Sequence, residues 1–463
     1  MENESDCVFP KSYVMKGGEG PHSYAQNSTG QKSAIEAAKH HLQNAVTKKF
    51  DFKAISASSN NLICIADLGC STGPNTFIAI QNITEAIQLK CQSQNQSAPE
   101  VLVFFNDQAS NDFNTLFQNL PPNRNYFAAG IPGSFYGRLF PKQSLHLVHT
   151  SAALSWLSEL PKELTDRSCG ALNKGRIFYT NAPSEVYDAY QRQFKMDWEA
   201  FLQARAQELV DNGIMACLMN VVNDIDFKVD LYLGKDFELL ASCLTDMAKS
   251  GLIQEEKVNT FNVPVFYPHV KDLMKVLETN EDFSIEQSEV LDNNCFVVPN
   301  IESFVSRLRA VLEVLIENHF GVGIVDELFE RFTDKVREFP EIMDVPKLKF
   351  HLFFVVLTRK FIVALLKAKS KEVREMVTII LERVEHIWDI WNVRGAIMFS
   401  FLVQVFLVLF APFRPRLDSL LLQFLIWTAY MLANWAANFT VGLITNNAGG
   451  NNNGGNKKIL RAL

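Results

Sequence analysis

The sequence predicts an α/β fold with a parallel, doubly wound sheet. Short apolar runs at 62–66, 101–105 and 145–148 each stop at polar residues, which is the pattern of strands buried on both faces of a sheet. Helix-like stretches separate such runs, and alternation of strands with helices indicates βαβ units. The composition agrees, because 48% of the 463 residues are apolar and 21% are charged, which is enough to bury a sizeable core.

The expected elements follow one another in chain order. The strands are the short apolar runs 62–66, 101–105, 145–148, 177–180 and 214–219. The helices are the amphipathic stretches 34–49, 75–90 and 186–210. Beyond residue 235 the pattern is mostly helical, which predicts a cap over about residues 235–345.

Charge divides the chain into two unlike parts at about residue 360. Residues 1–360 carry 33 Lys and Arg against 45 Asp and Glu, whereas residues 361–463 carry 11 against 6. An acidic part without basic clusters cannot neutralise a phosphate backbone, so nucleic acid is excluded as a partner. The eight cysteines include no C-x-x-C pair, which argues against a zinc ribbon. The N-terminus has no apolar signal region, so a cytoplasmic catalytic part is expected.

The basic part predicts membrane segments. Residues 361–394 are expected to form an amphipathic helical linker, and residues 395–413 and 419–445 contain no charged side chain. Each uncharged stretch is long enough for a hydrocarbon core of about 30 Å, so two transmembrane helices are expected within 395–445. The alternative is a pair of buried helices in a globular fold. Basic residues flank both ends and favour a cytoplasmic side for each, and an Asn/Gly-rich flexible tail follows at 446–463.

The strongest sign of a binding site is the loop at 67–75, between the first strand and the next helix. A glycine turn there lets a ligand approach the backbone at a helix N-terminus. No Lys follows Gly73, as a phosphate-cradling loop requires, and the loop lacks the G-x-G-x-x-G dinucleotide pattern. An acidic residue, a glycine and a small-residue turn remain, the usual shape of an S-adenosylmethionine loop; a structural turn is the alternative. Asp67 is then expected near the methionine end of the cofactor and Asp107 at its ribose.

Six segments in order carry a resemblance to a known family. They lie at 23–31, 67–75, 106–114, 132–141, 145–158 and 255–262. The chain resembles the plant SABATH methyltransferases over about residues 8–360, including a closing strand at 353–357. These enzymes make methyl esters of salicylate, jasmonate, benzoate, indole-acetate or gibberellate, and they include the N-methyltransferases of caffeine formation. The resemblance implies a Rossmann-like class I methyltransferase sheet with a helical cap, and a homodimer.

The resemblance also implies S-adenosyl-L-methionine as the cofactor and a small carboxylic acid as the substrate. Gln31 and Trp156 match the pair that holds the substrate carboxylate and form the expected catalytic residues. A carboxylic acid is already ionised at neutral pH, so methyl transfer needs precise positioning and no general base. The cofactor-binding residues implied by the matched motifs are Tyr24, Asp67, Gly69, Cys70, Asn75, Asp107, Gln108, Ser134 and Phe135.

Several positions depart from the family pattern. Ala152 and Ser155 stand where larger side chains are usual, which enlarges the acid pocket. Ser155, Leu308 and Phe350 are the expected pocket wall beside Gln31 and Trp156. Some members bind Mg²⁺, and the matching residues are Asn173, Asn259, Phe261 and Asn262. Asn259 replaces the usual Asp, and hard cations favour carboxylates, which argues against the metal.

The basic part has a resemblance of its own. Residues 387–395, 404–409, 412–414 and 427–430 resemble the N-terminal portion of a plant integral-membrane family of unknown function. Either a gene fusion or a faulty gene model explains the joining, and the incompleteness of the second part favours the faulty model. Two other functions stay open: N-methylation of a purine alkaloid, and an inactive, membrane-anchored binding module.

Overall fold

The structure, a computed structural model, describes residues 13–50, 61–165, 173–222, 234–292, 298–343 and 351–360. The chain divides into two units, Met1–Ala364 and Leu365–Leu463. The linker expected at 361–394, the spans expected within 395–445 and the tail at 446–463 all lie outside the described residues. Within the described ranges, no helix combines the length and the apolar character needed to cross a bilayer.

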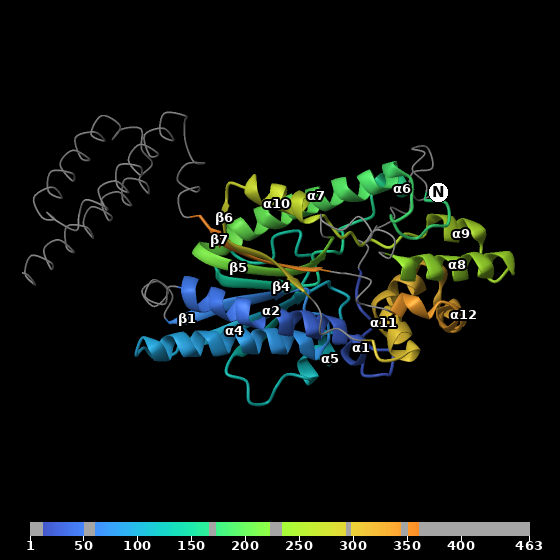
Figure 1. The fold of residues 1–463 in the computed structure, drawn as a ribbon. Helices are drawn as coiled ribbons and strands as arrows, with labels where there is room; N and C mark the ends of the chain where they lie inside the picture. The colour runs from blue at the N-terminus through green and yellow to red at the C-terminus, as the bar shows by residue number, and fades with distance from the viewer. Residues whose placement is uncertain are drawn as a thin grey trace, which may run out of the picture. The chain divides into compact units, whose positions relative to one another are not determined.

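One seven-stranded sheet, in the order β3-β2-β1-β4-β5-β7-β6, organises the described part of the chain (Figure 1). The strands are β1 (Leu62–Leu68), β2 (Glu100–Asp107), β3 (Phe127–Pro132), β4 (Leu145–Ser151), β5 (Leu209–Val221), β6 (Phe283–Asp292) and β7 (His351–Arg359). Strands β1 to β5 pair in parallel, as predicted. The expectation of a wholly parallel sheet is wrong for its last two strands, because β7 runs antiparallel to both β5 and β6.

The position of the cap explains the antiparallel edge. His351, the first residue of β7, pairs with Val221, the last residue of β5. Asp292, the last residue of β6, pairs with the same His351, so the chain leaves the sheet after β6 at this end, forms the helices Ile301–Phe320 and Val325–Glu338, and returns there as β7. A strand that enters from that end can pair directly with β5 only in the opposite direction. The sheet is therefore mixed.

Helices cover both faces of the sheet and one end. Figure 1 shows α2 and α4 on one face, α7 and α10 on the other, and α8, α9, α11 and α12 gathered beyond one end of the strands. The helices are α1 (Tyr24–Asn27), α2 (Thr29–Lys49), α4 (Pro74–Ser93), α5 (Phe113–Gln118), α6 (Lys162–Thr165), α7 (Ser184–Glu208), α8 (Lys235–Lys249), α9 (Glu255–Thr260), α10 (Val270–Glu278), α11 (Ile301–Phe320) and α12 (Val325–Glu338). Short 3₁₀ turns occur at Val322–Ile324 and Pro340–Met343. The described part has a Rossmann-like α/β fold.

Each face of the sheet has its own apolar core. Ile63 and Ile65 of β1 are fully buried against α2 and α4, where Ile80 and Ile83 are also fully buried. On the other face Trp198 and Phe201 of α7 are fully buried. Strands buried on both faces therefore have the continuous apolar runs that made them recognisable in the sequence.

The strand predicted at 177–180 is wrong. These residues form a loop between Asn173 and α7, although Ile177, Phe178 and Tyr179 are buried. The backbone turns to a positive φ of 54° at Asn181, which ends any extended course. A short apolar run indicates that its residues are buried, but it does not show that they form a strand. Here the residues are buried by packing between aromatic rings, because the Phe178 ring centroid lies 4.3 Å from that of Phe237 in α8.

Candidate active site

The loops after β1, β2 and β4 meet at one edge of the sheet. Strand order reverses at β1, whose neighbours are β2 on one side and β4 on the other. In open α/β sheets ligands bind outside the carboxyl ends of the strands at such a switch point. The segments predicted to bind the cofactor follow these strands.

The loop after β1 is built from close backbone contacts. Gly69 has a φ of +80°, and a Cβ there would lie 2.3 Å from the Ala153 Cβ, so no larger residue fits. The N–H groups of Gly69 and Cys70 both donate to the Asn106 carbonyl at 2.9 Å. Ser71, with a φ of 51°, donates its N–H to Asp107 Oδ2 at 2.7 Å. The turn is thereby tied to the end of β2.

Asp67 is held from two sides below this loop. It pairs in register with His149 of β4, and His149 Nδ1 donates to Asp67 Oδ1 at 2.6 Å. The Thr76 hydroxyl of α4 donates to Asp67 Oδ2. Asp67 and His149 are both 4% exposed. Both carboxylate oxygens thus have protein partners, and Asp67 ties the end of β1 to β4 and to α4.

Asp107, the last residue of β2, faces the loop. Its Oδ2 accepts from the Ser71 N–H and its Oδ1 from the Gln108 N–H, each at 2.7 Å. Burial raises the pKa of the Asp107 carboxyl to about 6, and the nearby Asp67 adds to the rise, while the two N–H donors oppose it. Two spare lone pairs on an otherwise oriented carboxylate suit the two hydroxyls of a ribose.

The N-terminal segment closes over the loop. Asn75 Nδ2 donates to the Ser28 carbonyl at 3.0 Å and to its hydroxyl at 2.9 Å, which attaches α4 to the segment between α1 and α2. A Cβ at Gly73 would lie 3.4 Å from the Tyr24 ring. Burial raises the pKa of the Tyr24 phenol, and the charges of Asp107 and Asp67 raise it further. Tyr24 and Asn75 therefore lie beside the carboxylate of Asp107 and the loop that is bonded to it.

Other predicted cofactor residues lie around the same edge. The Phe135 ring is 8% exposed, and a Cβ at Gly69 would lie 3.7 Å from it. Burial raises the pKa of the Cys70 thiol. Ser134 is exposed in the turn after β3, where its hydroxyl accepts from the Tyr136 N–H at 3.4 Å.

Buried polar atoms without a protein partner gather here. Around the loop they are Ser71 Oγ, Thr72 Oγ1, Asn106 Oδ1, Asn111 Oδ1, Thr150 Oγ1 and Ser151 Oγ. Such atoms are rare in folded proteins and mark places where water or a ligand completes the bonding. Together with the glycine turn, they fit a polar cofactor at this edge.

The residues predicted to bind the acid come from α2 and from the segment after β4. Gln31 lies on α2, and its buried Oε1 has no hydrogen-bond partner. Trp156 is partly buried; its carbonyl accepts from the Tyr136 hydroxyl at 2.5 Å, and its ring stacks on Tyr13 at 6.2 Å between centroids. It also pairs with Val265 as an isolated bridge.

The expected pocket wall is described in part. Ser155 is 3% exposed, its carbonyl accepts from the Phe266 N–H at 2.8 Å, and its hydroxyl has no partner. Ala152 has a φ of 60° and donates its N–H to the Leu218 carbonyl at 2.8 Å. Leu308 of α11 is 6% exposed, and Phe350 lies outside the described residues.

The expected metal positions do not fit Mg²⁺. Asn173 Nδ2 donates to Asn262 Oδ1 at 3.0 Å and to the Phe178 carbonyl at 2.8 Å, so one lone pair of the Asn262 oxygen is already taken. Phe261 is buried against Phe320, and Asn259 lies on α9. All four side chains are uncharged, and hard cations favour carboxylates. Among the described residues, no group of three His, Cys, Asp or Glu side chains could hold a metal ion.

Comparison with known proteins decides the family. A family described as "SAM dependent carboxyl methyltransferase" matches residues 10–360. The chain belongs to this family. It is 43% identical over 359 residues to loganic acid O-methyltransferase of Catharanthus roseus, covering 76% of this chain and 95% of the relative. It is 42% identical to a probable S-adenosylmethionine-dependent methyltransferase of Arabidopsis thaliana, over 76% and 99% of the two chains.

A solved structure agrees with the sequence comparison. The structure of loganic acid methyltransferase with SAH matches with a TM-score of 0.70 at 43% identity, over 75% of this chain and 98% of the other. Farnesoic acid carboxyl-O-methyltransferase of Arabidopsis thaliana is 36% identical over 75% of this chain and 99% of the relative. The protein is an S-adenosylmethionine-dependent carboxyl O-methyltransferase.

Sequence reasoning missed several residues that build the site. His149 and Thr76 orient Asp67, and Asn106 receives the loop N–H groups. His149 lies at the end of a predicted strand, so the register of adjacent parallel strands was the signal that could have placed it beside Asp67. The contacts of Thr76 and Asn106 depend on how α4 and β2 pack against the loop, and residue spacing in the sequence does not predict this packing.

Proposed function

We propose that the enzyme methylates a small plant carboxylic acid of the jasmonate, salicylate, benzoate or indole-acetate class. The observation that carries the proposal is the loop tied to Asp107 at the switch point, in a chain that retains Gln31 and Trp156. S-adenosylmethionine supplies an electrophilic methyl group. Gln31 and Trp156 provide neutral N–H donors, which hold the carboxylate without an added charge.

The residues of the site position the acid and take no proton from it. A carboxylic acid is ionised at neutral pH, so its oxygen is already a nucleophile. A new oxygen–methyl bond forms as the sulfur–methyl bond breaks, and the products are a methyl ester and S-adenosylhomocysteine. Holding the reacting atoms about 3–3.5 Å apart and in line is the main contribution expected from the protein.

Methyl transfer to a panel of acids tests this proposal. The full chain is incubated with S-adenosylmethionine labelled in the methyl group and with jasmonate, salicylate, benzoate, indole-acetate, loganic acid and farnesoic acid in turn. Volatile or extractable labelled ester with at least one acid is the expected result. A parallel incubation contains 3,7-dimethylxanthine, and labelled methyl on its nitrogen, with none on any acid, would contradict the assignment.

N-methylation of a purine alkaloid is the second candidate within the family. Caffeine synthase 1 of Camellia crassicolumna is 38% identical over 69% of this chain and 89% of the relative. The retained pair of Gln31 and Trp156 favours a carboxylic acid as the substrate.

An inactive binding module is the third candidate, and the small side chains of Ala152 and Ser155 are the observation that suggests it. Cofactor binding without transfer to any acid would favour it.

The remaining expectations are proposals of the same kind. We propose a cytoplasmic catalytic part that forms a homodimer, which sedimentation of the purified chain tests. We derive no step through Mg²⁺, because Asn173, Asn259, Phe261 and Asn262 do not suit it.

The family match ends at residue 360, before the predicted spans at 395–445. In the native protein, a peptide that crosses 360–371 would exclude a faulty gene model and leave a membrane-anchored fusion.

A further inference from the structure

The segment 132–141 contains a residue, Tyr136, that neither the proposed cofactor site nor the proposed acid site uses. Its neighbour Phe135 lies beside Gly69 on the cofactor side, and the ring centroids of Phe135 and Tyr136 are 4.8 Å apart. The Tyr136 hydroxyl donates to the Trp156 carbonyl at 2.5 Å. A carbonyl can only accept, so the phenol supplies the proton. Tyr136 therefore joins the cofactor side to the acid side.

A buried ion pair of α7 fixes the backbone on both sides of Tyr136. Arg205 Nη1 donates to the Phe135 carbonyl at 2.7 Å, and Nη2 donates to the Gly137 carbonyl at 2.9 Å. Arg205 Nε also donates to Glu208 Oε2 at 2.7 Å, and both side chains are fully buried. A buried charge that loses its partner is strongly unfavourable, so this arrangement resists displacement. The backbone of Tyr136 is thus a fixed point.

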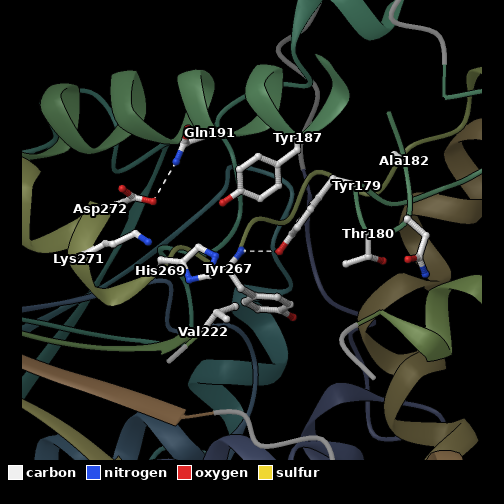
Figure 2. A pocket seen from close by; sticks show the side chains of 11 residues that line it. Tyr179, Thr180, Ala182, Tyr187, Gln191, Val222, Tyr267, His269, Lys271 and Asp272 are labelled. Carbon is white, nitrogen blue, oxygen red and sulfur yellow. Dashed lines mark hydrogen bonds between the residues drawn. The ribbon is translucent and has the colours of Figure 1, made fainter. Parts of the chain in front are cut away.

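Helix α7 also holds the segment that follows Trp156. The carboxylate of Asp197 accepts from the Ser158 N–H at 2.8 Å and from the Ser158 hydroxyl at 2.6 Å. Nearer the start of α7, Gln191 Nε2 donates to Asp272 Oδ2 of α10 at 3.0 Å, as Figure 2 shows, so the helix is itself attached to its neighbour. One helix is therefore the common base for the segments of Tyr136 and Trp156.

The peptide unit between Trp156 and Leu157 is held at both of its polar ends. Tyr136 holds the carbonyl, and the Leu157 N–H donates to the Pro264 carbonyl at 2.8 Å. A peptide unit is a rigid plane, so a tilt of this one would displace the Cα of Trp156 and its indole. Burial raises the pKa of the Tyr136 phenol, and the charge of Asp197 raises it further, so the hydroxyl keeps the proton that it donates.

We propose that Tyr136 is a positioning residue for methyl transfer. Its hydroxyl holds the Trp156 backbone, and through it the indole N–H, at a fixed place relative to Phe135 on the cofactor side. Transfer requires the reacting atoms to be close and in line, so a small displacement of the indole lowers the rate. This inference rests on the proposed function, because it assumes that the indole N–H holds the carboxylate of the acid.

Tyr136→Phe tests the inference, because it removes the hydroxyl and keeps the ring that packs on Phe135. For the panel acid that gives the most ester, kcat/KM of the full chain should fall about fivefold, the worth of one net hydrogen bond. Affinity for S-adenosylhomocysteine, measured by calorimetry, should change less than twofold. Tyr126→Phe is the matched control and should leave both quantities unchanged. Tyr126 precedes β3 where Tyr136 follows it, and its buried hydroxyl has no hydrogen-bond partner among the described residues.

A double-mutant cycle separates positioning of Trp156 from a general structural role. In Trp156→Phe the indole N–H is absent, so adding Tyr136→Phe should lower kcat/KM by less than a further twofold. A further fivefold loss would show that Tyr136 acts independently of Trp156 and would overturn the inference. An unchanged kcat/KM in Tyr136→Phe, beside a loss in Trp156→Phe, would overturn it as well.

A fluorine spectrum tests the same inference without catalysis. The full chain is labelled with 5-fluorotryptophan, and the Trp156 line is assigned by its loss in Trp156→Phe. Tyr136→Phe should shift or broaden this line, whereas Tyr126→Phe should leave it in place. An identical Trp156 line in the wild-type protein and in Tyr136→Phe overturns the inference. Failure of methyl transfer to every acid counts against the proposed function and leaves this spectral comparison valid.

Discussion

The cofactor side and the acid side of the active site are held together by different means. On the cofactor side, backbone N–H groups of Gly69, Cys70 and Ser71 bond to β2. On the acid side, the Trp156 backbone pairs with Val265, but the groups expected to hold the acid are side chains: the Trp156 ring, which stacks on Tyr13, and Gln31 of α2. Geometry made by backbone changes little when side chains are replaced, whereas a pocket walled by side chains changes with each of them. The same fold can therefore keep one cofactor and accept different acids.

Asp107→Ala is expected to have the largest effect on this comparison. The variant removes the acceptors for the Ser71 and Gln108 N–H groups and the expected ribose contact, and each hydrogen bond to a charged group is worth about 1.5–3 kcal/mol. Affinity for S-adenosylhomocysteine should fall at least about 100-fold, measured by calorimetry. Asp188→Ala, exposed on α7, is the control. Unchanged affinity in a folded Asp107→Ala protein would refute the site assignment.

Gly69→Ala should have the next largest effect, because it tests whether the backbone turn itself makes the cofactor side. The new Cβ would lie 2.3 Å from the Ala153 Cβ at a φ of +80°. Affinity for S-adenosylhomocysteine should fall about 30-fold, since clash and strain together cost about 2 kcal/mol. The double variant with Ala153→Gly removes the clash and should recover part of the loss. No recovery would show that the clash is not the cause.

Trp156→Phe tests the acid side. Phenylalanine keeps a ring to pack on Tyr13 but lacks the indole N–H, which is worth about 1.5 kcal/mol when it donates to a carboxylate. KM for the acid should rise about tenfold, while affinity for S-adenosylhomocysteine changes less than twofold. Steady-state kinetics and calorimetry on the same preparation separate the two effects. A parallel loss of cofactor affinity would mean that the two sides are not independent.

The pH dependence of cofactor binding should be the smallest effect. Burial raises the pKa of Asp107 to about 6, so in the free protein the carboxylate is lost as pH falls through that value. S-adenosylhomocysteine should bind three- to tenfold more weakly at pH 5 than at pH 7, by the fraction of Asp107 that is ionised. The same shift makes ionised Asp107 a cost to the free fold above about pH 6, because its pKa is raised above the unfolded value. Flat affinity between pH 5 and 7 would contradict the assignment.

The buried strands were predictable because their signal is local. Ile63 and Ile65 in β1, and Val101 and Val103 in β2, are buried on a sheet covered on both faces, so continuous apolar runs mark them. The predicted runs 62–66, 101–105, 145–148, 214–219 and 353–357 all lie within strands. The edge strands β3 and β6 were missed. Phe127 in β3 is 60% exposed and most of the residues after it are Ala and Gly, which are depleted in strands. Strand β6 mixes Ser, Glu and Gln with apolar residues, so neither edge strand has the pattern of a strand buried on both faces.

The sequence by itself determined the catalytic family, the parallel core of the sheet and the segments that meet at its edge. Motifs 67–75 and 106–114 follow buried strands, and parallel strands bring their carboxyl ends together whatever the rest of the chain does. Only the tertiary structure decided that His149 holds Asp67, that Asn173 donates to Asn262, and that the 177–180 run is a loop lining a cavity. The reason is physical: burial and strand pairing leave a periodic trace in the sequence, whereas contacts between residues 80 or more positions apart depend on how whole elements pack.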